Sequence, residues 1–285
     1  WVAQHVTKRP ARVRLAVTLL QTFLRWCAKQ PEYRVIDAEV CGDHKRDLPK
    51  QKPRTDLLER EQLRLWFEAI GKMPSVTMAA YLQIVLLTGA RREELARMKW
   101  VDVDFEWDSL TLRDKAESKG GQDGKRTIAI TPHIRALLLE LKTINETKPR
   151  AKVKRLHGDE APAKQWKPSP YVFPSVQAKR ETIGDPLAAM NRAIETVGLP
   201  HLTIHGLRRS FATLTEWVEM PEGISSQIQG HKPTNVRERH YKRRPLSLLR
   251  LWQAKFEQWV LSEAGIAAPN EAENHKPALT AIQGG

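Results

Sequence analysis

The chain has 285 residues, of which 41% are hydrophobic and 28% are charged. This length can bury one large hydrophobic core or two smaller ones, and the composition is typical of a soluble globular protein. No run of 18 apolar residues occurs, which excludes a membrane-spanning helix. The first residue is Trp1 and no signal-like stretch follows it, so we expect a fragment of a longer protein.

The charge balance favours a polyanionic partner. Lysine and arginine number 47 against 33 acidic residues, a formal net charge of +14 with a pI near 9.9. Such an excess suits nucleic acid, because each neutralised phosphate releases counterions, although a basic solvated surface without a specific role gives the same composition. The two cysteines, Cys27 and Cys41, form no C-x-x-C pair, which predicts a reduced, cytoplasmic protein without a structural zinc site.

The first part of the chain is predicted to be helical up to Pro31. The apolar residues that recur there at three- and four-residue spacing are Val13, Ala16, Leu20, Phe23 and Cys27. A basic, proline-broken stretch follows at 45–54 and has little to bury. We interpret it as a linker that can lie along a phosphate backbone.

A second periodic region opens at Thr55, a plausible N-cap. One helical face there consists of Leu63, Trp66, Phe67 and Ile70. A more apolar helix is predicted over 76–87, and it ends at Thr88 and Gly89.

From Val101 to Thr131 the pattern changes to short alternating runs, V-D-V-D, S-L-T-L-R and R-T-I-A-I-T. These predict three antiparallel strands, the last two joined by the glycine-rich turn S-K-G-G-Q-D-G-K. A helix is predicted from about Pro132 to Ile144, an exposed loop over 148–167, and further helices from Asp185 to about Ala264.

The segment L-L-T-G-A-R-R-E-E-L, which begins at Leu86, carries the first candidate site residue. An apolar helix ends at Gly89, and Arg91 opens the next helix beside free backbone N–H groups. A helix start is a favourable place for a phosphate. A surface arginine paired with Glu94 would give the same pattern.

The second segment, H-G-L-R-R-S-F-A-T, places His205 and Arg208 three residues apart on one helix face. A separate core face of the same helix consists of Leu207, Phe211, Leu214 and Val218. The polar pair is therefore displayed from a helix that is packed on its other side, although a plain exposed polar face would look alike.

The third segment contains Gly230 and His231, followed ten residues later by Tyr241 within R-E-R-H-Y-K-R-R. Of the four tyrosines, Tyr81 and Tyr171 lie in apolar runs that indicate structural roles. Tyr241 alone is surrounded by basic residues, where it would meet a phosphate, although an amphipathic tyrosine on a basic helix has the same surroundings.

Taken in order, T-G-x-R-x-x-E, a lysine in a β-turn, H-x-x-R, G-H and a following tyrosine closely resemble the motifs of tyrosine site-specific recombinases of the phage-integrase type. The resemblance covers about Thr55 to Pro245. The residues that match the family's catalytic positions are Arg91, Lys119, His205, Arg208, His231 and Tyr241.

The resemblance implies a role for each of these residues. The two arginines clamp the scissile phosphate, with the two histidines beside them, and the tyrosine attacks the phosphorus. Lys119, in the strand-to-strand turn, protonates the leaving 5′-oxygen. Glu94 matches the family's acidic position and supports Arg91 rather than acting as a catalyst.

This chemistry agrees with the residue types. Guanidinium forks match phosphate oxygens and stabilise the charge that develops on a pentacoordinate centre. The phosphodiester energy is kept in a 3′-phosphotyrosine link, so we expect no cofactor, ATP or divalent metal. The sequence contains no Walker loop, no G-x-G-x-x-G and no metal-ligand cluster.

Two details depart from the family's pattern. The gap between His231 and Tyr241 is one residue longer than usual, which the turn around Lys232 and Pro233 can absorb. The turn also holds Lys125 as an alternative general acid, although the position after the strand favours Lys119.

We therefore expect a mainly helical α+β protein. Its catalytic domain, with a small three-stranded antiparallel sheet, is preceded by a partial helical core-binding domain. The expected division is 1–46 for the DNA-binding part, 47–54 for the basic linker, 55–265 for the catalytic domain and 266–285 for an unstructured tail. The residues expected to contact DNA outside the catalytic set are Lys45, Arg46, Lys50, Lys52, Arg54, Arg92, Lys125, Arg209, Arg243 and Arg244.

The expected partners are double-stranded DNA, four protomers in a synaptic complex and accessory DNA-bending proteins, in a nucleoid-associated setting. Past Pro245, a stripe of Leu249, Trp252, Phe256 and Trp259 is expected to dock on a neighbouring subunit, although it can equally pack on its own domain. The rival functions are a type IB topoisomerase or telomere resolvase, and a non-catalytic DNA-binding regulator.

Overall fold

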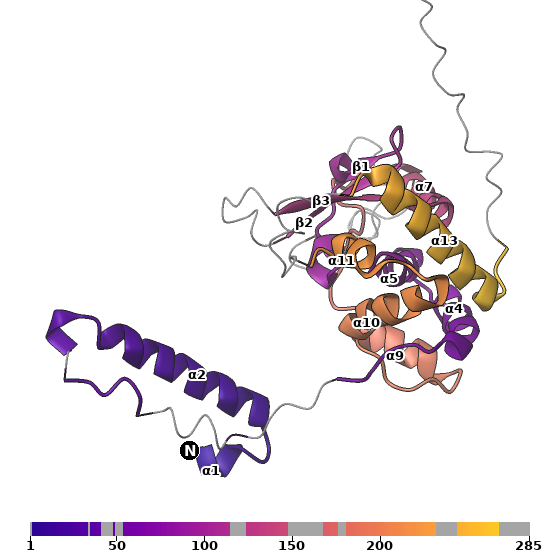
Figure 1. Cartoon of the computed structure of the whole chain (residues 1–285). Coiled ribbons are helices and arrows are strands. Elements are labelled where there is room, and N and C mark those ends of the chain that lie inside the picture. Colours follow the sequence, from indigo (N-terminus) through magenta and orange to yellow (C-terminus); the bar gives the residue numbers. More distant parts are fainter. Residues whose placement is uncertain are drawn as a thin grey trace, which may run out of the picture. The chain divides into compact units, whose positions relative to one another are not determined.

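A computed structural model of the chain describes residues 2–33, 35–40, 48, 54–114, 124–147, 168–175, 181–231 and 244–267. The chain divides into two compact units, Trp1–Thr55 and Asp56–Gly285 (Figure 1). The described residues are mainly helical and contain one three-stranded antiparallel sheet, which confirms the predicted α+β class. In these ranges no helix combines the length and the apolar character needed to cross a membrane.

The first unit contains α1 (Val2–His5), α2 (Pro10–Cys27) and a short 3₁₀ helix, Pro31–Tyr33. The predicted helix is confirmed, but not all of the apolar residues that indicated it are buried. Leu20 and Phe23 are about half exposed, at 49% and 57%. The buried stripe instead follows a spacing of four residues through Val13 and Val17, because these side chains pack with Leu48.

The second unit begins with a 3₁₀ helix, Arg60–Gln62, which leads into α4 (Leu63–Gly71). The predicted apolar face of α4 is confirmed, since all four of its side chains are buried. Thr55 is not the N-cap. The Gln62 side chain accepts a hydrogen bond from the backbone N–H of Glu59, so the helical segment starts there.

Helix α5 (Val76–Thr88) lies at the centre of this unit, in contact with α4, α7, α10 and α13 (Figure 1). Ser75 caps it by accepting a hydrogen bond from the N–H of Met78, at 3.3 Å. Every residue from Ala79 to Thr88 is buried, which explains why its sequence is apolar on all sides.

The sheet consists of β1 (Val103–Asp104), β2 (Ser109–Arg113) and β3 (Lys125–Ala129), hydrogen-bonded in that order. The three predicted strands are therefore confirmed, although the first is shorter because residues 101 and 102 belong to a 3₁₀ helix, Trp100–Asp102. Leu110 lies opposite Ile128, and both side chains are fully buried on the core face of the sheet.

The remaining helices are α6 (Arg92–Ala96), α7 (Pro132–Thr147), α9 (Leu187–Glu195), α10 (Ile204–Leu214), α11 (Glu222–Gln229) and α13 (Leu246–Ala264), with a 3₁₀ turn at Thr215–Val218. Residues 148–167, predicted as an exposed loop, and nearly all of the predicted tail lie outside the described residues.

Helix α13 packs on its own catalytic unit through Leu249 and Phe256, while Trp252 and Trp259 are only partly buried, so docking of the stripe on a neighbouring subunit stays a prediction. Leu249 and Phe256 are buried, and the Phe256 ring meets Phe211 edge to face at 5.0 Å between centroids. Polar contacts fix the same face. Gln253 accepts the N–H of Ala129 at 2.9 Å, while the Glu257 carboxylate accepts the first N–H groups of α7.

Candidate active site

The turn after α5 requires glycine. Gly89 has a φ of 58°, in the left-handed region. A Cβ at this position would lie 2.7 Å from the Phe211 ring and 2.8 Å from Nε2 of Gln229, closer than real Cβ atoms come. This compact turn places Arg91 at the N-cap of α6.

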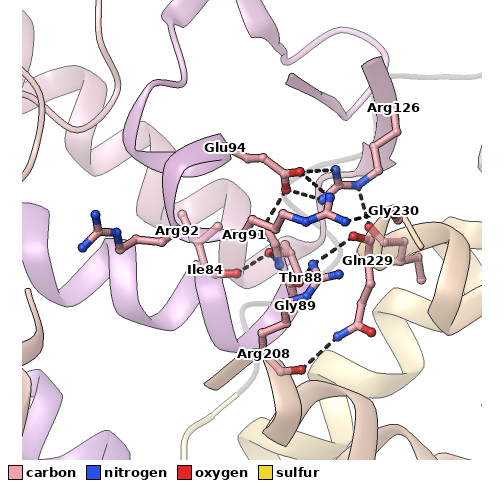
Figure 2. A network of polar contacts seen from close by, with 12 residues as sticks. Ile84, Thr88, Gly89, Arg91, Arg92, Glu94, Arg126, Arg208, Gln229 and Gly230 are labelled. Atoms are coloured by element: carbon pink, nitrogen blue, oxygen red, sulfur yellow. Dashed lines mark hydrogen bonds and ion pairs between the residues drawn. The ribbon is translucent and has the colours of Figure 1, made fainter. Parts of the chain in front are cut away.

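Glu94 lies between two guanidinium groups (Figure 2). Arg91 donates its backbone N–H to Oε2 at 2.9 Å and its Nη1 to Oε1 at 2.8 Å. Arg126, on β3, donates Nη1 to Oε1 at 2.9 Å and Nη2 to Oε2 at 2.6 Å. Burial alone would raise the pKa of Glu94, but the hydrogen bonds and charges of Arg126, followed by the bonds from Arg91, hold the pKa below its ordinary value.

Helix α10 presents the second pair of predicted residues. Thr203 caps the helix, accepting the N–H of Gly206 at 2.9 Å. His205 is exposed, whereas Arg208 is buried and donates its Nη1 to the carbonyl oxygens of Gly89 and Gln229. Burial, together with the positive charges of Arg91 and Arg126, lowers the pKa of Arg208 to about 10, so the group stays protonated at neutral pH.

The end of α11 holds the G-H motif. Gly230 has a φ of 72°, and its N–H reaches the carbonyl of Gln227 at 3.1 Å. The N–H of His231 reaches the carbonyl of Ser226 at 2.9 Å, which completes a Schellman motif. This cap leaves the last carbonyl groups of the helix directed outward, without intrahelical partners.

Three different arginines donate to the three carbonyls that follow one another at this end. Arg126 Nε binds the oxygen of Ile228 at 2.8 Å, and Arg208 Nη1 binds that of Gln229 at 2.9 Å. Arg91 Nη2 binds that of Gly230 at 3.1 Å. The partial negative charge of a helix C-terminus favours cations, so α11 gathers positive charge beside His231 (Figure 2).

This arrangement acts on His231 as well. Its side chain is exposed at the end of α11. Although the residue is exposed, partial desolvation of its ring, followed by the nearby positive charges of Arg208, Arg91 and Arg126, lowers its pKa, which favours the neutral imidazole at neutral pH. A neutral ring can accept a proton or a hydrogen bond.

An open pocket joins the first two motifs. Arg91 lines it from α6, while His205 and Arg208 line it from α10. The structure therefore brings the predicted arginines, Glu94 and both histidines together from segments more than 100 residues apart. Among the described residues, no group of three or more His, Cys, Asp or Glu side chains could hold a metal ion.

Tyr241 and Lys119 lie outside the described residues. Residues on both sides of the tyrosine segment are described, and both are anchored to α11. His231 follows the helix directly, and the Gln227 side chain binds the backbone N–H and carbonyl of Arg244 at 3.2 and 3.0 Å. Lys125, the alternative general acid, is the first residue of β3 and is exposed. Neighbouring strand residues point to opposite faces, so Lys125 points away from the face on which Arg126 reaches Glu94.

The predicted DNA contacts are only partly described. Lys45, Arg46, Lys50, Lys52 and Arg243 lie outside the described residues. Arg54 is exposed. Arg92 pairs with Asp185 and Glu93, each at 2.7 Å, and Arg209 pairs with Asp56. DNA contact stays a prediction for all three arginines. Arg92 and Arg209 would have to exchange their carboxylate partners for a phosphate.

Sequence reasoning missed Arg126. The motifs drew attention to the lysines of the neighbouring turn, and Arg126 was taken only as the start of an alternating strand. The alternation itself carried the signal, because it places Arg126 on the same face as the buried Ile128. An arginine on the inner face of a strand requires a buried partner, and here the partner is Glu94.

The sequence matches the Phage integrase family over residues 56–244 and the Phage integrase core-binding domain over residues 1–47. The chain belongs to the phage integrase family. It is 39% identical over 277 residues to prophage integrase IntF of Escherichia coli (strain K12), covering 96% of this chain and 54% of that protein. The chain thus spans about half the length of this curated relative.

Solved structures show the same fold. A lambda integrase dimer bound to a COC′ core site matches with a TM-score of 0.55 and 16% identity, over 86% of this chain and 81% of that one. XerH site-specific recombinase bound to a palindromic difH substrate matches with a TM-score of 0.58 and 18% identity, over 93% of this chain and 69% of that one.

Proposed function

We propose that this chain carries the catalytic part of a site-specific DNA recombinase, which integrates or excises a phage or mobile element through a 3′-phosphotyrosine intermediate. The observation that carries this proposal is the convergence of Arg91 and Arg208 on the end of α11, beside both histidines. Two cationic forks held by helix carbonyls form a preorganised site for one phosphate.

In the proposed first step, the Tyr241 phenol gives its proton to the neutral His231 imidazole, its oxygen bonds to the scissile phosphorus and the bond from phosphorus to the 5′-oxygen breaks. Arg91 and Arg208 stabilise the negative charge on the non-bridging oxygens. Lys119 gives its proton to the departing 5′-oxygen. The alternative donor, Lys125, is exposed at the start of β3, which favours Lys119 for this role. In the second step a 5′-hydroxyl attacks the phosphotyrosine and releases Tyr241, so no external energy source is consumed.

The proposed organisation assigns residues 1–46 to DNA binding, 47–54 to a basic linker and 55–265 to catalysis. The family matches over 1–47 and 56–244 support this division. We further infer that the protein acts on duplex DNA as a tetrameric synaptic complex, with accessory DNA-bending proteins, in the cytoplasm and associated with the nucleoid. The similar structure of a lambda integrase tetramer bound to a Holliday junction supports the DNA substrate and the tetramer.

Two rivals are separated by the products that they leave. A type IB topoisomerase relaxes supercoils without exchanging strands between two sites, and a non-catalytic regulator leaves no covalent product. The G-H and H-x-x-R motifs favour the recombinase, and every described catalytic position holds the expected residue type.

A nicked suicide substrate tests this proposal. We expect the protein, incubated with such substrates made from the ends of its element, to form a covalent DNA adduct with a free 5′-hydroxyl, in EDTA as in buffer. Intact paired sites should also give recombinant junctions. Binding without any adduct would support the regulator, and relaxation without junctions would support the topoisomerase.

A further inference from the structure

We propose that Arg126 is a positioning residue for strand cleavage, which fixes Glu94, and through it Arg91, to the α11 turn that ends in His231. The inference rests on the proposed function and deepens it. It assigns a task in the reaction to a residue of β3 that lies outside the motifs.

The geometry of the Arg126 guanidinium supports this role. All three of its nitrogens are used: Nη1 and Nη2 bind the two oxygens of Glu94 at 2.9 and 2.6 Å, and Nε binds the carbonyl of Ile228 at 2.8 Å. One planar group therefore joins β3, α6 and α11. Its side chain is 14% exposed and Glu94 is 3% exposed, so water screens this pair only weakly.

The space around Gly230 is adapted to this arginine. A Cβ at Gly230 would lie 2.8 Å from Arg126 Nη1 and 2.9 Å from its Cζ. Glycine at this position thus serves two purposes. It adopts the left-handed cap of α11, and it leaves room for the guanidinium against the backbone that precedes His231.

Charge explains why Glu94 needs a second partner. Arg91 is 43% exposed and lines the pocket, so it can bind an incoming phosphate. If Glu94 had Arg91 as its sole cationic partner, the pair would be neutral, and the carboxylate would compete with the phosphate for the same fork. With Arg126 present, one carboxylate faces two guanidiniums and the group keeps a net positive charge. Arg126 is absent from the residues that line the pocket, so it acts through its neighbours.

The test compares Arg126→Lys and Arg126→Met with a matched control, Arg135→Met. Arg135, on α7, is also partly buried, at 21%, and pairs with Asp108, and neither residue is among those that line the pocket. We expect both Arg126 variants to lose about 10- to 100-fold in single-turnover cleavage at saturating DNA, the usual loss when a partner that orients a functional side chain is removed. Lysine should fail to rescue, because one ammonium cannot reproduce the three directed bonds. The control should cleave at the wild-type rate.

Three outcomes would overturn the proposal. Cleavage by Arg126→Lys within twofold of wild type would show that charge alone suffices. A lower melting temperature of the Arg126 variants, with normal cleavage by the protein that remains folded, would show a merely structural role. Additive losses in a cycle of Arg126→Met with Glu94→Gln would show that the two residues act independently, whereas we expect the double variant to be no slower than Arg126→Met alone.

A second readout does not depend on enzymatic activity. The charged and titratable groups whose electrostatic effect lowers the pKa of the His231 imidazole are Arg208, Arg91, Arg126 and His205. Removal of one guanidinium in Arg126→Met should raise the pKa of His231, measured by NMR titration in the free protein, and Arg135→Met should leave it unchanged. An unchanged His231 pKa in Arg126→Met would contradict the placement of Arg126. If wild type forms no adduct but this titration behaves as expected, the proposed reaction fails while the positioning contact stands.

Discussion

At the scale of single residues, the site is organised around backbone carbonyls. Arg208 contacts Gly89 and Gln229, one at each of the two glycine turns that the sequence motifs contain. Both partners belong to the backbone of the protein itself, so the fold holds the guanidinium in place. Preorganised donors cost no reorganisation during the reaction, which is why such groups can replace a metal ion in stabilising charge.

The general acid can be tested with one chemical substitution. Lys119→Ala should slow cleavage by about 10²–10⁴-fold, the usual contribution of a positioned proton donor. A substrate with a 5′-bridging sulfur should restore the rate, because a thiolate leaves without a proton. The measurement is the single-turnover cleavage rate on both substrates. Rescue of Lys125→Ala instead would reverse the assignment within the turn.

The carboxylate of Glu94 should make a measurable contribution to the pH dependence of stability. Its pKa is lowered in the folded protein, so its ionised form stabilises the fold above its ordinary pKa, and this stabilisation is lost as pH falls through the lowered value. The melting temperature of wild type should therefore fall more steeply between pH 6 and pH 3 than that of Glu94→Gln. Identical slopes for the two proteins would contradict the paired carboxylate.

At the scale of elements, much of the fold was predictable because burial imposes periodicity. Three sequence patterns each predicted the element that forms. These are the apolar face of α4, the uniformly apolar sequence of α5 and the alternation in the strands. Gly89 and Gly230 were recognised as motif residues, but their physical reason, the approach of Phe211 and Arg126, depends on tertiary contacts that spacing does not encode.

What spacing could not predict has physical causes at the same scale. Thr55 has the chemistry of an N-cap, but the chain after it first contacts α10, where Asp56 accepts the N–H of Thr203 at 2.9 Å. The aromatic stripe of α13 was periodic in the sequence, but periodicity cannot say which surface covers it. The same helix carries Gln253 and Glu257, and both are buried. Buried polar groups need fixed partners, so these two residues indicate packing within the chain.

Packing of α13 on its own unit leads to a stability prediction. Phe256→Ala should destabilise the free protein by about 3–5 kcal/mol, the usual cost of removing a large buried aromatic side chain. Leu251→Ala is the control, because this residue lies on the same helix and is 64% exposed. Thermal melting beside a gel assay for synaptic complexes measures both effects. A selective loss of synapsis with little change in melting would instead favour docking of the stripe on a neighbouring subunit.

At the scale of the whole molecule, the formal net charge of +14 should dominate DNA affinity. Many arginine side chains of the described site already bind carboxylates or carbonyl groups of the protein. The site itself therefore offers few charges for binding DNA phosphates. Binding should weaken steeply between low and moderate salt, because phosphate contacts release counterions. Titrations of a labelled duplex at several salt concentrations give the slope, and a flat dependence would contradict a backbone clamp.

If Tyr241 attacks a phosphate that Arg91 and Arg208 hold, a comparison of Tyr241→Phe with Tyr171→Phe on a nicked suicide substrate will show it. Tyr171 is the matched control, because it lies in the apolar run Y-V-F-P and contacts Lys99 rather than the site. We expect Tyr241→Phe to bind DNA with wild-type affinity and to form no covalent adduct, and Tyr171→Phe to form adducts normally. Covalent adducts with Tyr241→Phe would contradict this role of Tyr241.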